Sequence, residues 1–276
     1  MIIDGHVHIC EPPYTQEKAC VNIVGGRPMA MPVKKADFTA DILLRDMDRH
    51  HIDKAVIMAF PGLLSNEFLS KVVKKFPKRL IGFASVPDPK NADESIRILK
   101  KAVKQLGLKG LKLHPDCHKF SPADPEIIPL MQCAADFDIP VLIHSFAGGM
   151  IRGYFEHNVP KNVDILKSHV PNLKIIIAHM AGPRFLDLLT IGQIPGVFVE
   201  TSWGLTLVAD LFGIDFATKF IRNVGVDKFI FGSDWSGTPH PATREQLDLI
   251  QKLSLTEEER KKLVGENIAK VLRITA

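Results

Sequence analysis

The 276-residue sequence has few cysteines, little net charge and no extended apolar segment. Its four cysteines have no Cys-x-x-Cys spacing, so no disulfide framework is indicated and a reducing, cytoplasmic environment is expected. No apolar stretch approaches the roughly 18 residues of a membrane span, and no leader-like segment opens the sequence, so no membrane association is expected. The 35 basic residues are scattered among 31 acidic ones without a basic, aromatic-containing run, so a nucleic-acid partner is not expected.

The sequence does have histidines at the ends of short apolar runs. The first run, Met1-Ile2-Ile3, leads directly into Asp-Gly-His-Val-His, which contains His6 and His8. In a β-strand these two side chains project to the same face, about 7 Å apart along the backbone. Two imidazoles side by side at the end of a buried strand provide half of a metal site.

Four later runs have the same form, and their final polar residues are His114, His144, His179 and Asp234. Each run is short, apolar or β-branched, and bounded by turn residues, as is typical of buried parallel strands. A single histidine at a strand end is most often a hydrogen-bonded core residue. Burying several unpaired polar groups costs about 1–3 kcal/mol each, so this many strand ends together indicate a functional site.

The runs alternate with segments of helical period, which predicts a parallel sheet with right-handed crossovers. Eight such units predict an α/β fold, a (β/α)₈ TIM barrel that forms one domain over residues 1–276. Thr256, with Glu259 three residues later, is expected to begin an extra C-terminal helix. The poorly periodic segment 11–37 is a long loop after strand 1 and a candidate lid. The predicted strands are 1–9, 53–60, 80–86, 108–114, 140–146, 174–180, 197–202 and 229–235.

In such barrels the catalytic groups occupy the C-terminal ends of the strands. Three imidazoles and one carboxylate there form a nitrogen-rich site for one divalent ion, with zinc expected and manganese, iron or cobalt as alternatives. The predicted ligands are His6, His8, His144 and Asp234. His179 is the predicted acid/base, because an imidazole with a pKa near ~6.5 exchanges protons readily, and Asp234 is expected to share in proton transfer.

Four further residues are candidates for substrate binding. His114 and Lys112 lie on one strand face and are expected to orient an acidic substrate, although a buried, salt-bridged lysine is an equal alternative for Lys112. Arg152, after strand 5, is a candidate for binding a carboxylate, and a surface arginine is the more ordinary interpretation. Trp203, after strand 7, is suited to stacking on a planar substrate, with core packing as an equal alternative.

Several of these motifs resemble the amidohydrolase superfamily. They are the Asp-x-His-x-His opening, the strand-end His144 and His179, and Gly232-Ser233-Asp234. The match is most similar to the amidohydrolase-2 branch related to aminocarboxymuconate-semialdehyde decarboxylase, on the basis of Lys112-Leu-His-Pro115, Ile177-Ala-His-Met-Ala-Gly182 and the closing segment 264–272. The resemblance implies that His6, His8, His144 and Asp234 bind one divalent metal and that His179 is the acid/base. It leaves a second metal at Lys112 open.

Two reactions are compatible with these residues. The preferred expectation is a metal-dependent hydrolase, in which an activated water attacks an amide, lactone or ester of a small, carboxylated substrate. The alternative is a metal-dependent, non-oxidative decarboxylase of a carboxylated ring or unsaturated acid. A metal-stabilised barrel without turnover is disfavoured, because neither the ligands nor the proton-transfer group are missing. A small-molecule substrate is expected, and a homodimer is left open.

Overall fold

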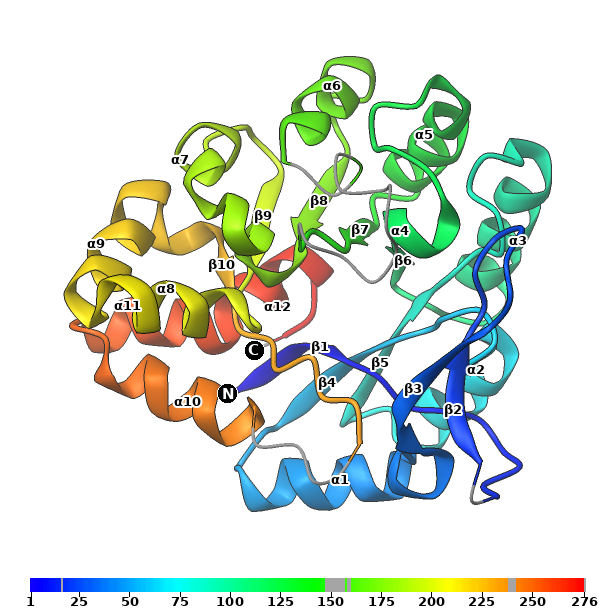
Figure 1. Ribbon diagram of the computed structural model, residues 1–276, viewed down its shortest axis with the longest axis horizontal. Coiled ribbons are helices and arrows are strands. Elements are labelled where there is room, and N and C mark those ends of the chain that lie inside the picture. The colour runs from blue at the N-terminus through cyan, green and yellow to red at the C-terminus, as the bar shows by residue number, and fades with distance from the viewer. Residues whose placement is uncertain (16, 147–156, 158–159, 238–241, 276) are drawn as a thin grey trace.

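The computed structural model describes residues 1–275 except 16, 147–156, 158–159 and 238–241. Eight parallel strands follow one another in chain order around a nearly closed barrel (Figure 1). They are β1 (Ile3–Val7), β4 (Lys54–Met58), β5 (Leu80–Ala84), β6 (Gly110–Leu113), β7 (Pro140–Ile143), β8 (Lys174–Ile177), β9 (Val197–Glu200) and β10 (Phe229–Ile230). The predicted barrel and all eight predicted strands are confirmed.

The strands end earlier than the sequence pattern predicts. β7 ends at Ile143 and β8 at Ile177, so His144 and His179 are among the first residues beyond the strands. His179 has a φ of 59°, in the left-handed region, which an extended strand does not contain. The histidines therefore leave the sheet where the chain turns into the loops that form the barrel mouth.

Helices surround the barrel and bury their apolar faces against it. They are α1 (Ala40–Arg49), α2 (Asn66–Lys75), α3 (Ala92–Lys104), α4 (Pro115–His118), α5 (Ile128–Asp136), α6 (Lys161–His169), α7 (Leu188–Ile191), α8 (Gly204–Phe212), α9 (Ile214–Val224) and α10 (Ala242–Lys252). α8 and α9 are separated at Gly213, whose φ of 86° suits glycine. Among the described residues, no helix has both the length and the apolarity needed to cross a membrane.

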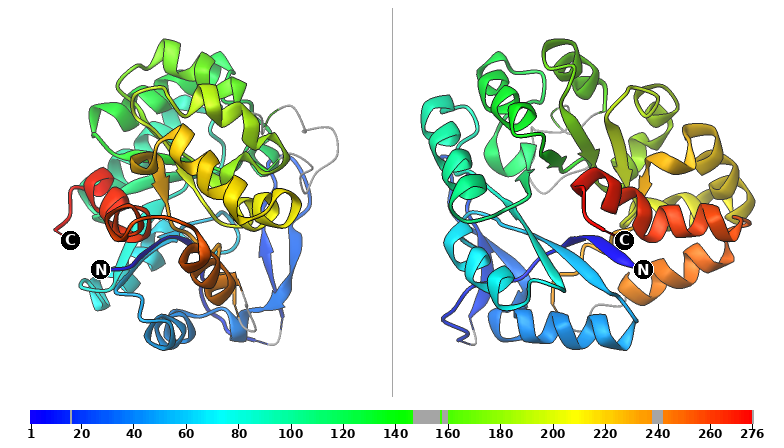
Figure 2. Two further views of the ribbon diagram at one scale, coloured as in Figure 1. Left: turned by 90° about the vertical axis from the view of Figure 1, so that its left-hand side faces the viewer. Right: turned by 180° about the vertical axis from the view of Figure 1, so that it is seen from behind.

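The C-terminal helix forms as predicted. Thr256 and Glu259 make a reciprocal capping box at the start of α11 (Glu257–Lys261), and the chain continues through one π-helical turn into α12 (Asn267–Leu272). Ile268 and Val271 pack against Ile3 and other barrel residues. Figure 2 (right) shows α12 across the barrel end that faces away in Figure 1. This helix therefore covers the end of the barrel opposite the strand-end histidines.

Segment 11–37, predicted as a long loop, contains an antiparallel hairpin of β2 (Lys18–Val21) and β3 (Met29–Lys34). Figure 1 shows this hairpin beside α2 at the edge of the barrel. Backbone bonds from Asn22 N–H to the Pro61 carbonyl (2.7 Å) and from Val24 N–H to the Cys117 carbonyl (2.9 Å) attach it to the loops after β4 and β6. The segment is thus a structured wall of the barrel mouth.

The barrel closes where β1 meets the chain after β10, a contact that we call the seam. Three backbone bonds cross it: Gly5 N–H to the Phe231 carbonyl, Asp234 N–H to the His6 carbonyl, and His8 N–H to the Trp235 carbonyl. The buried Asp4 carboxylate also accepts bonds from the Ser233 N–H (3.0 Å) and hydroxyl (2.6 Å). Burial raises the pKa of Asp4 to about 7. The seam is therefore held by both main-chain and side-chain bonds.

We predict that Ser233→Ala lowers the free energy of unfolding by about 1–3 kcal/mol, because it leaves a buried Asp4 oxygen without its hydroxyl donor. Urea unfolding followed by circular dichroism measures the change. Ser168→Ala is the matched control, since Ser168 is exposed and its hydroxyl donates to the Ile165 carbonyl of its own helix. Equal effects of the two substitutions would contradict the role given to the Asp4–Ser233 pair.

Candidate active site

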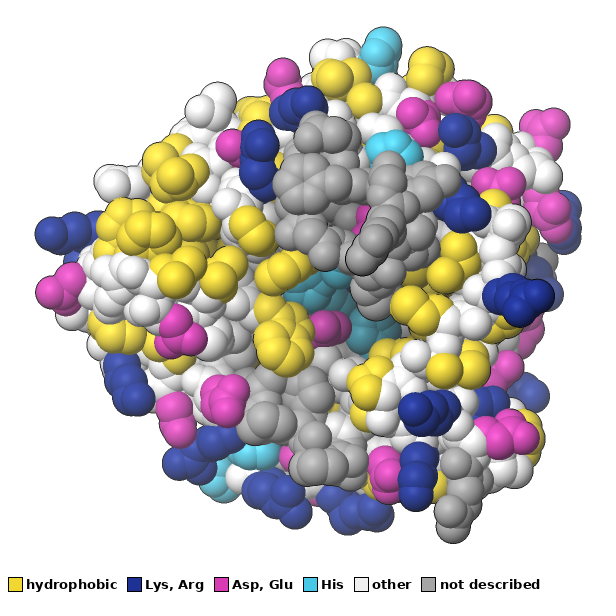
Figure 3. Space-filling model, viewed as in Figure 1, with side chains coloured by type: hydrophobic (Ala, Val, Ile, Leu, Met, Phe, Trp, Pro, Cys, Tyr) yellow, Lys and Arg dark blue, Asp and Glu magenta, His cyan; other side chains and the backbone are white. Residues whose placement is uncertain are grey.

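The strand-end side chains gather in a hollow at the open end of the barrel. Figure 3 shows histidine and acidic side chains at the bottom of this hollow, ringed by hydrophobic ones. A cavity of about 130 Å³ lies there. The described residues that line it are His8, Val21, Met31, Phe60, Leu63, Lys112, His114, His144, His179, Asp234 and Ser236. The structure thus brings five distant segments of predicted site residues to one place.

Three of the four predicted metal ligands form one group across the seam. The Nε2 atoms of His6 and His8 are 3.2 Å apart, and Asp234 Oδ1 lies 3.5 Å from the first and 3.3 Å from the second. Burial alone raises the pKa of Asp234, but the neighbouring imidazoles of His6, His8 and His179 lower it well below its usual range. Asp234 is therefore held as a carboxylate that faces two ring nitrogens.

This spacing fits one divalent cation. Ligand atoms at 2.0–2.2 Å from a common ion are separated from one another by roughly 3.0–3.5 Å, and the three measured separations fall in this range. Two imidazoles and a carboxylate are suitable ligands for zinc, manganese, iron or cobalt. The residues present therefore fit a first-row divalent ion.

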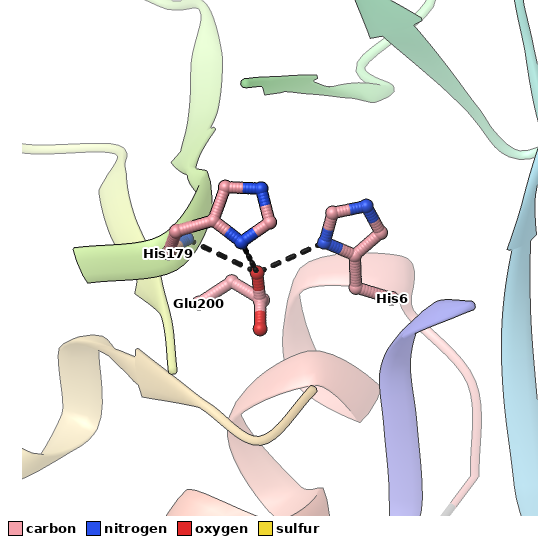
Figure 4. A group of neighbouring side chains, drawn as sticks. All are labelled: His6, His179 and Glu200. Carbon is pink, nitrogen blue, oxygen red and sulfur yellow. Dashed lines mark hydrogen bonds and ion pairs between the residues drawn. The ribbon is translucent and has the colours of Figure 1, made fainter. Parts of the chain in front are cut away.

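Glu200, at the end of β9, orients this group, and it is not among the residues predicted from the sequence. Its buried carboxylate accepts bonds from His6 Nδ1 (2.9 Å) and from the His179 backbone N–H (3.2 Å), as Figure 4 shows. Ser202 adds its backbone N–H (2.5 Å) and its hydroxyl (2.9 Å). An ionised carboxylate only accepts, so the proton of His6 is assigned to Nδ1, and Nε2 presents a lone pair to the group.

Burial raises the pKa of Glu200, while its four donors favour the charged form. Glu200 could have been predicted from the sequence, because Val197-Phe-Val-Glu200 is also a short apolar run that ends in a polar residue. Unlike the other strand-end runs, this run contains neither a histidine nor a Gly-Ser-Asp motif.

The same network sets the proton position on His179. Its Nδ1 lies 2.8 Å from the Ser202 hydroxyl oxygen, and its Nε2 lies 3.0 Å from His144 Nδ1. Because the Ser202 hydroxyl donates to Glu200, its oxygen accepts from Nδ1–H of His179, which leaves Nε2 as an acceptor. Burial lowers the pKa of His179 to about 4. The neutral ring therefore presents an unprotonated nitrogen on the cavity side.

The remaining predicted residues are distributed around this group. His144 stacks on His114 with ring centroids 3.7 Å apart and bonds His179, so it lines the cavity beside the His6, His8 and Asp234 group. Its role as a fourth ligand stays a prediction. His114 lines the same cavity, as expected of a substrate-binding residue.

Lys112 is fully buried on β6, and its Nζ lies 3.1 Å from His6 Nε2. Among the described residues, this imidazole is its hydrogen-bond partner, and it forms no salt bridge with a carboxylate. Burial lowers the pKa of Lys112 to about 8, so the side chain is still mostly cationic at neutral pH. Lys112 thus places a positive charge at the cavity next to the metal-binding group.

Trp203 is not among the residues that line the cavity, and it is not a core residue. It is 49% exposed, and its indole Nε1 donates to Asp234 Oδ2 at 2.9 Å. Stacking on substrate therefore stays a prediction. Arg152, the candidate carboxylate binder, lies outside the described residues.

Three residues of the site share an unusual backbone conformation. His179, Trp203 and Asp234 have φ angles of 59°, 58° and 55°, each on the turn after its strand. The left-handed region costs an L-residue about 1–2 kcal/mol. Gly204 allows the turns to approach closely, since a Cβ there would overlap the His179 carbonyl. Such strain persists where the surrounding contacts determine the conformation, and it is typical of functional sites.

A larger cavity of about 410 Å³ lies beside α2 and α3. Its lining charges already have partners, with Lys101 Nζ 2.6 Å from Glu67 and Arg97 paired to Glu94. It contains none of the clustered histidines, so the reactive groups lie in the smaller cavity.

The chain is similar to known proteins over most of its length. The model of the family described as Amidohydrolase matches residues 3–274. The 2-amino-3-carboxymuconate-6-semialdehyde decarboxylase of Dictyostelium discoideum is 22% identical, over 84% of this chain and 76% of its own length. Similar solved structures include 5-carboxyvanillate decarboxylase from Sphingomonas paucimobilis (TM-score 0.74, 17% identity, 99% of both chains). Another is dihydroxybenzoic acid decarboxylase from Polaromonas with bound manganese (TM-score 0.69, 18% identity, 99% and 96%).

We predict that His6→Ala abolishes stoichiometric binding of Mn²⁺, because it removes the central nitrogen of the three-residue group. Elemental analysis of metal-loaded, desalted protein measures the bound ion. His169→Ala, which alters an exposed histidine at the end of α6, is the matched control and should keep its metal. A full complement of metal in His6→Ala would show that the ion binds elsewhere.

Proposed function

Since the chain belongs to the amidohydrolase family, we propose that it is a divalent-metal-dependent decarboxylase that removes CO₂ from a small carboxylated ring or unsaturated acid. The observation that carries the proposal is the fully buried Lys112 ammonium beside the metal-binding group, where it could pair with the carboxylate of a substrate. The names of the three relatives, all decarboxylases, support the same reaction.

This proposal reverses the preference drawn from the sequence, in which hydrolysis came first and decarboxylation was the alternative. The histidine and aspartate pattern serves either reaction, because a metal-activated water and a metal-bound carboxylated substrate need the same ligands. The relatives favour the decarboxylase, and the positive charge at the cavity floor agrees with them.

The cavity suits a small planar acid. Val21, Met31, Phe60 and Leu63 give it an apolar side, while Lys112 and the imidazoles give it a polar side. Its volume of about 130 Å³ is well below the roughly 300–1,000 Å³ of pockets for drug-sized ligands. We therefore propose a substrate of about one ring, with its carboxylate toward Lys112 and His114.

Loss of CO₂ breaks a carbon–carbon bond, leaves the electron pair on the substrate carbon and requires one proton there. When bound, a divalent cation supplies Lewis-acid stabilisation of negative charge on substrate oxygens. His179 takes a proton from solvent at Nε2 and gives it to the carbon, while Ser202 and Glu200 hold its Nδ1–H in place. His6 and His8, through Nε2, and the ionised Asp234, through Oδ1, are the residues that would hold this ion.

We propose one metal ion per chain. Zinc was expected from the ligand types, and the manganese in a neighbouring structure makes Mn²⁺ the first ion to test. His144 is the proposed fourth ligand. A homodimer and a cytoplasmic location stay predictions from the sequence.

The reaction itself is tested with the Mn²⁺-loaded protein and a panel of monocyclic and unsaturated carboxylic acids. We expect CO₂ release and, in D₂O, one deuterium at the vacated carbon. His179→Asn should lower kcat by about 10²–10⁴-fold, because the proton donor is lost, while the bound metal is nearly unchanged. Hydrolysis of amides, lactones or esters without CO₂ release would contradict the decarboxylase, and loss of metal from His179→Asn would contradict the role of His179.

We predict that Lys112→Met raises KM by about tenfold or more, because a charge-assisted bond to the substrate carboxylate is lost. Steady-state kinetics at saturating Mn²⁺ measures this change. Lys109→Met, an exposed lysine just before the same strand, is the matched control. An unchanged KM in Lys112→Met would show that Lys112 does not bind the substrate.

A further inference from the structure

Trp203 makes the two oxygens of Asp234 different. Its indole Nε1–H donates to Oδ2 at 2.9 Å, while Oδ1 faces His6 Nε2 at 3.5 Å and His8 Nε2 at 3.3 Å. Oδ2 thus accepts a hydrogen bond from Trp203, while Oδ1 faces the two imidazoles. We propose that Trp203 is a positioning residue that presents Asp234 to a divalent cation through Oδ1 alone.

The inference rests on the metal ion of the proposed function and not on the identity of the substrate. A carboxylate that rotates freely can bind a cation with one oxygen, with both, or turn toward water. An N–H bond to one oxygen of an ionised carboxylate is charge-assisted and selects the first arrangement. Partners of this kind, one step away from the metal, commonly change metal affinity or activity by 10–100-fold when they are removed.

The backbone of Trp203 has a conformation that L-residues rarely adopt. Trp203 has φ 58° and ψ −45°, outside the regions preferred by L-residues. Bonds on both sides fix this turn, from Ser202 N–H to Glu200 Oε1 (2.5 Å) and from Leu205 N–H to the Thr201 carbonyl (3.0 Å). The first of these involves the carboxylate that also orients His6, so one turn controls two predicted ligands.

Trp203 is about half exposed, so burial does not require its N–H to bond Asp234. An exposed bond of this kind adds little to the free energy of unfolding. Its effect is expected on the orientation of Asp234, and therefore on metal binding, rather than on stability. This role differs from the substrate stacking that the sequence suggested.

The test is Trp203→Phe, which keeps an aromatic ring and removes the N–H donor. The dissociation constant of Mn²⁺ is measured by titration calorimetry on the metal-stripped full chain, and the urea midpoint is measured on the same metal-free protein. We expect the dissociation constant to rise about tenfold or more, with an unchanged midpoint. Leu211→Ala, which alters an exposed apolar residue of α8, the helix that follows Trp203, is the control and should bind Mn²⁺ as the wild type does.

A Mn²⁺ dissociation constant within twofold of the wild type would overturn the inference. So would an affinity loss accompanied by an equal loss of metal-free stability, because that result indicates a structural role. If the wild type binds no Mn²⁺, the proposed metal site fails together with this inference. If the wild type binds Mn²⁺ and Trp203→Phe weakens it, but no substrate loses CO₂, only the proposed reaction fails.

Discussion

Closure of the barrel between its first strand and the chain after its last strand is the constraint on which the site depends. His6 and His8 lie on one side of this seam and Asp234 on the other, more than two hundred residues later in the sequence. The backbone bonds of Asp234 to His6 and of His8 to Trp235 set the carboxylate and the imidazoles at 3.3–3.5 Å. The closing interaction of the fold and the metal-binding group are therefore one structural feature.

Several buried polar groups around the seam bond to one another. Glu200 orients His6 and His179, Ser202 links Glu200 to His179, and His179 in turn bonds His144. The left-handed turns after β8, β9 and β10 aim these side chains at the barrel axis, and the hydrogen bonds offset the backbone strain. The strands supply rigidity, and the reactive groups lie near the C-terminal ends of the strands or on the first residues beyond them.

The sequence allowed the barrel, its eight strands and the capped C-terminal helix to be predicted, since each depends on local periodicity or a local motif. It also predicted His6, His8, His179 and Asp234, which the structure brings together, because a polar residue at the end of an apolar run is a visible signal. Glu200 carried that signal without a histidine and was missed. The hairpin within 11–37 was missed because its short strands have little periodicity, and the break at Gly213 depends on a local φ. Hydrolysis and decarboxylation use the same ligands, so the choice between them required the position of Lys112 and the relatives.

The most direct test of this account is a crystal structure of the Mn²⁺-loaded protein with anomalous scattering measured at the manganese edge. The account predicts one peak bound by His6 Nε2, His8 Nε2 and Asp234 Oδ1, with Asp234 Oδ2 still bonded to the Trp203 indole. A peak at another cluster, such as His114, Asp116 and His144, or no peak between the two sides of the seam, would contradict it.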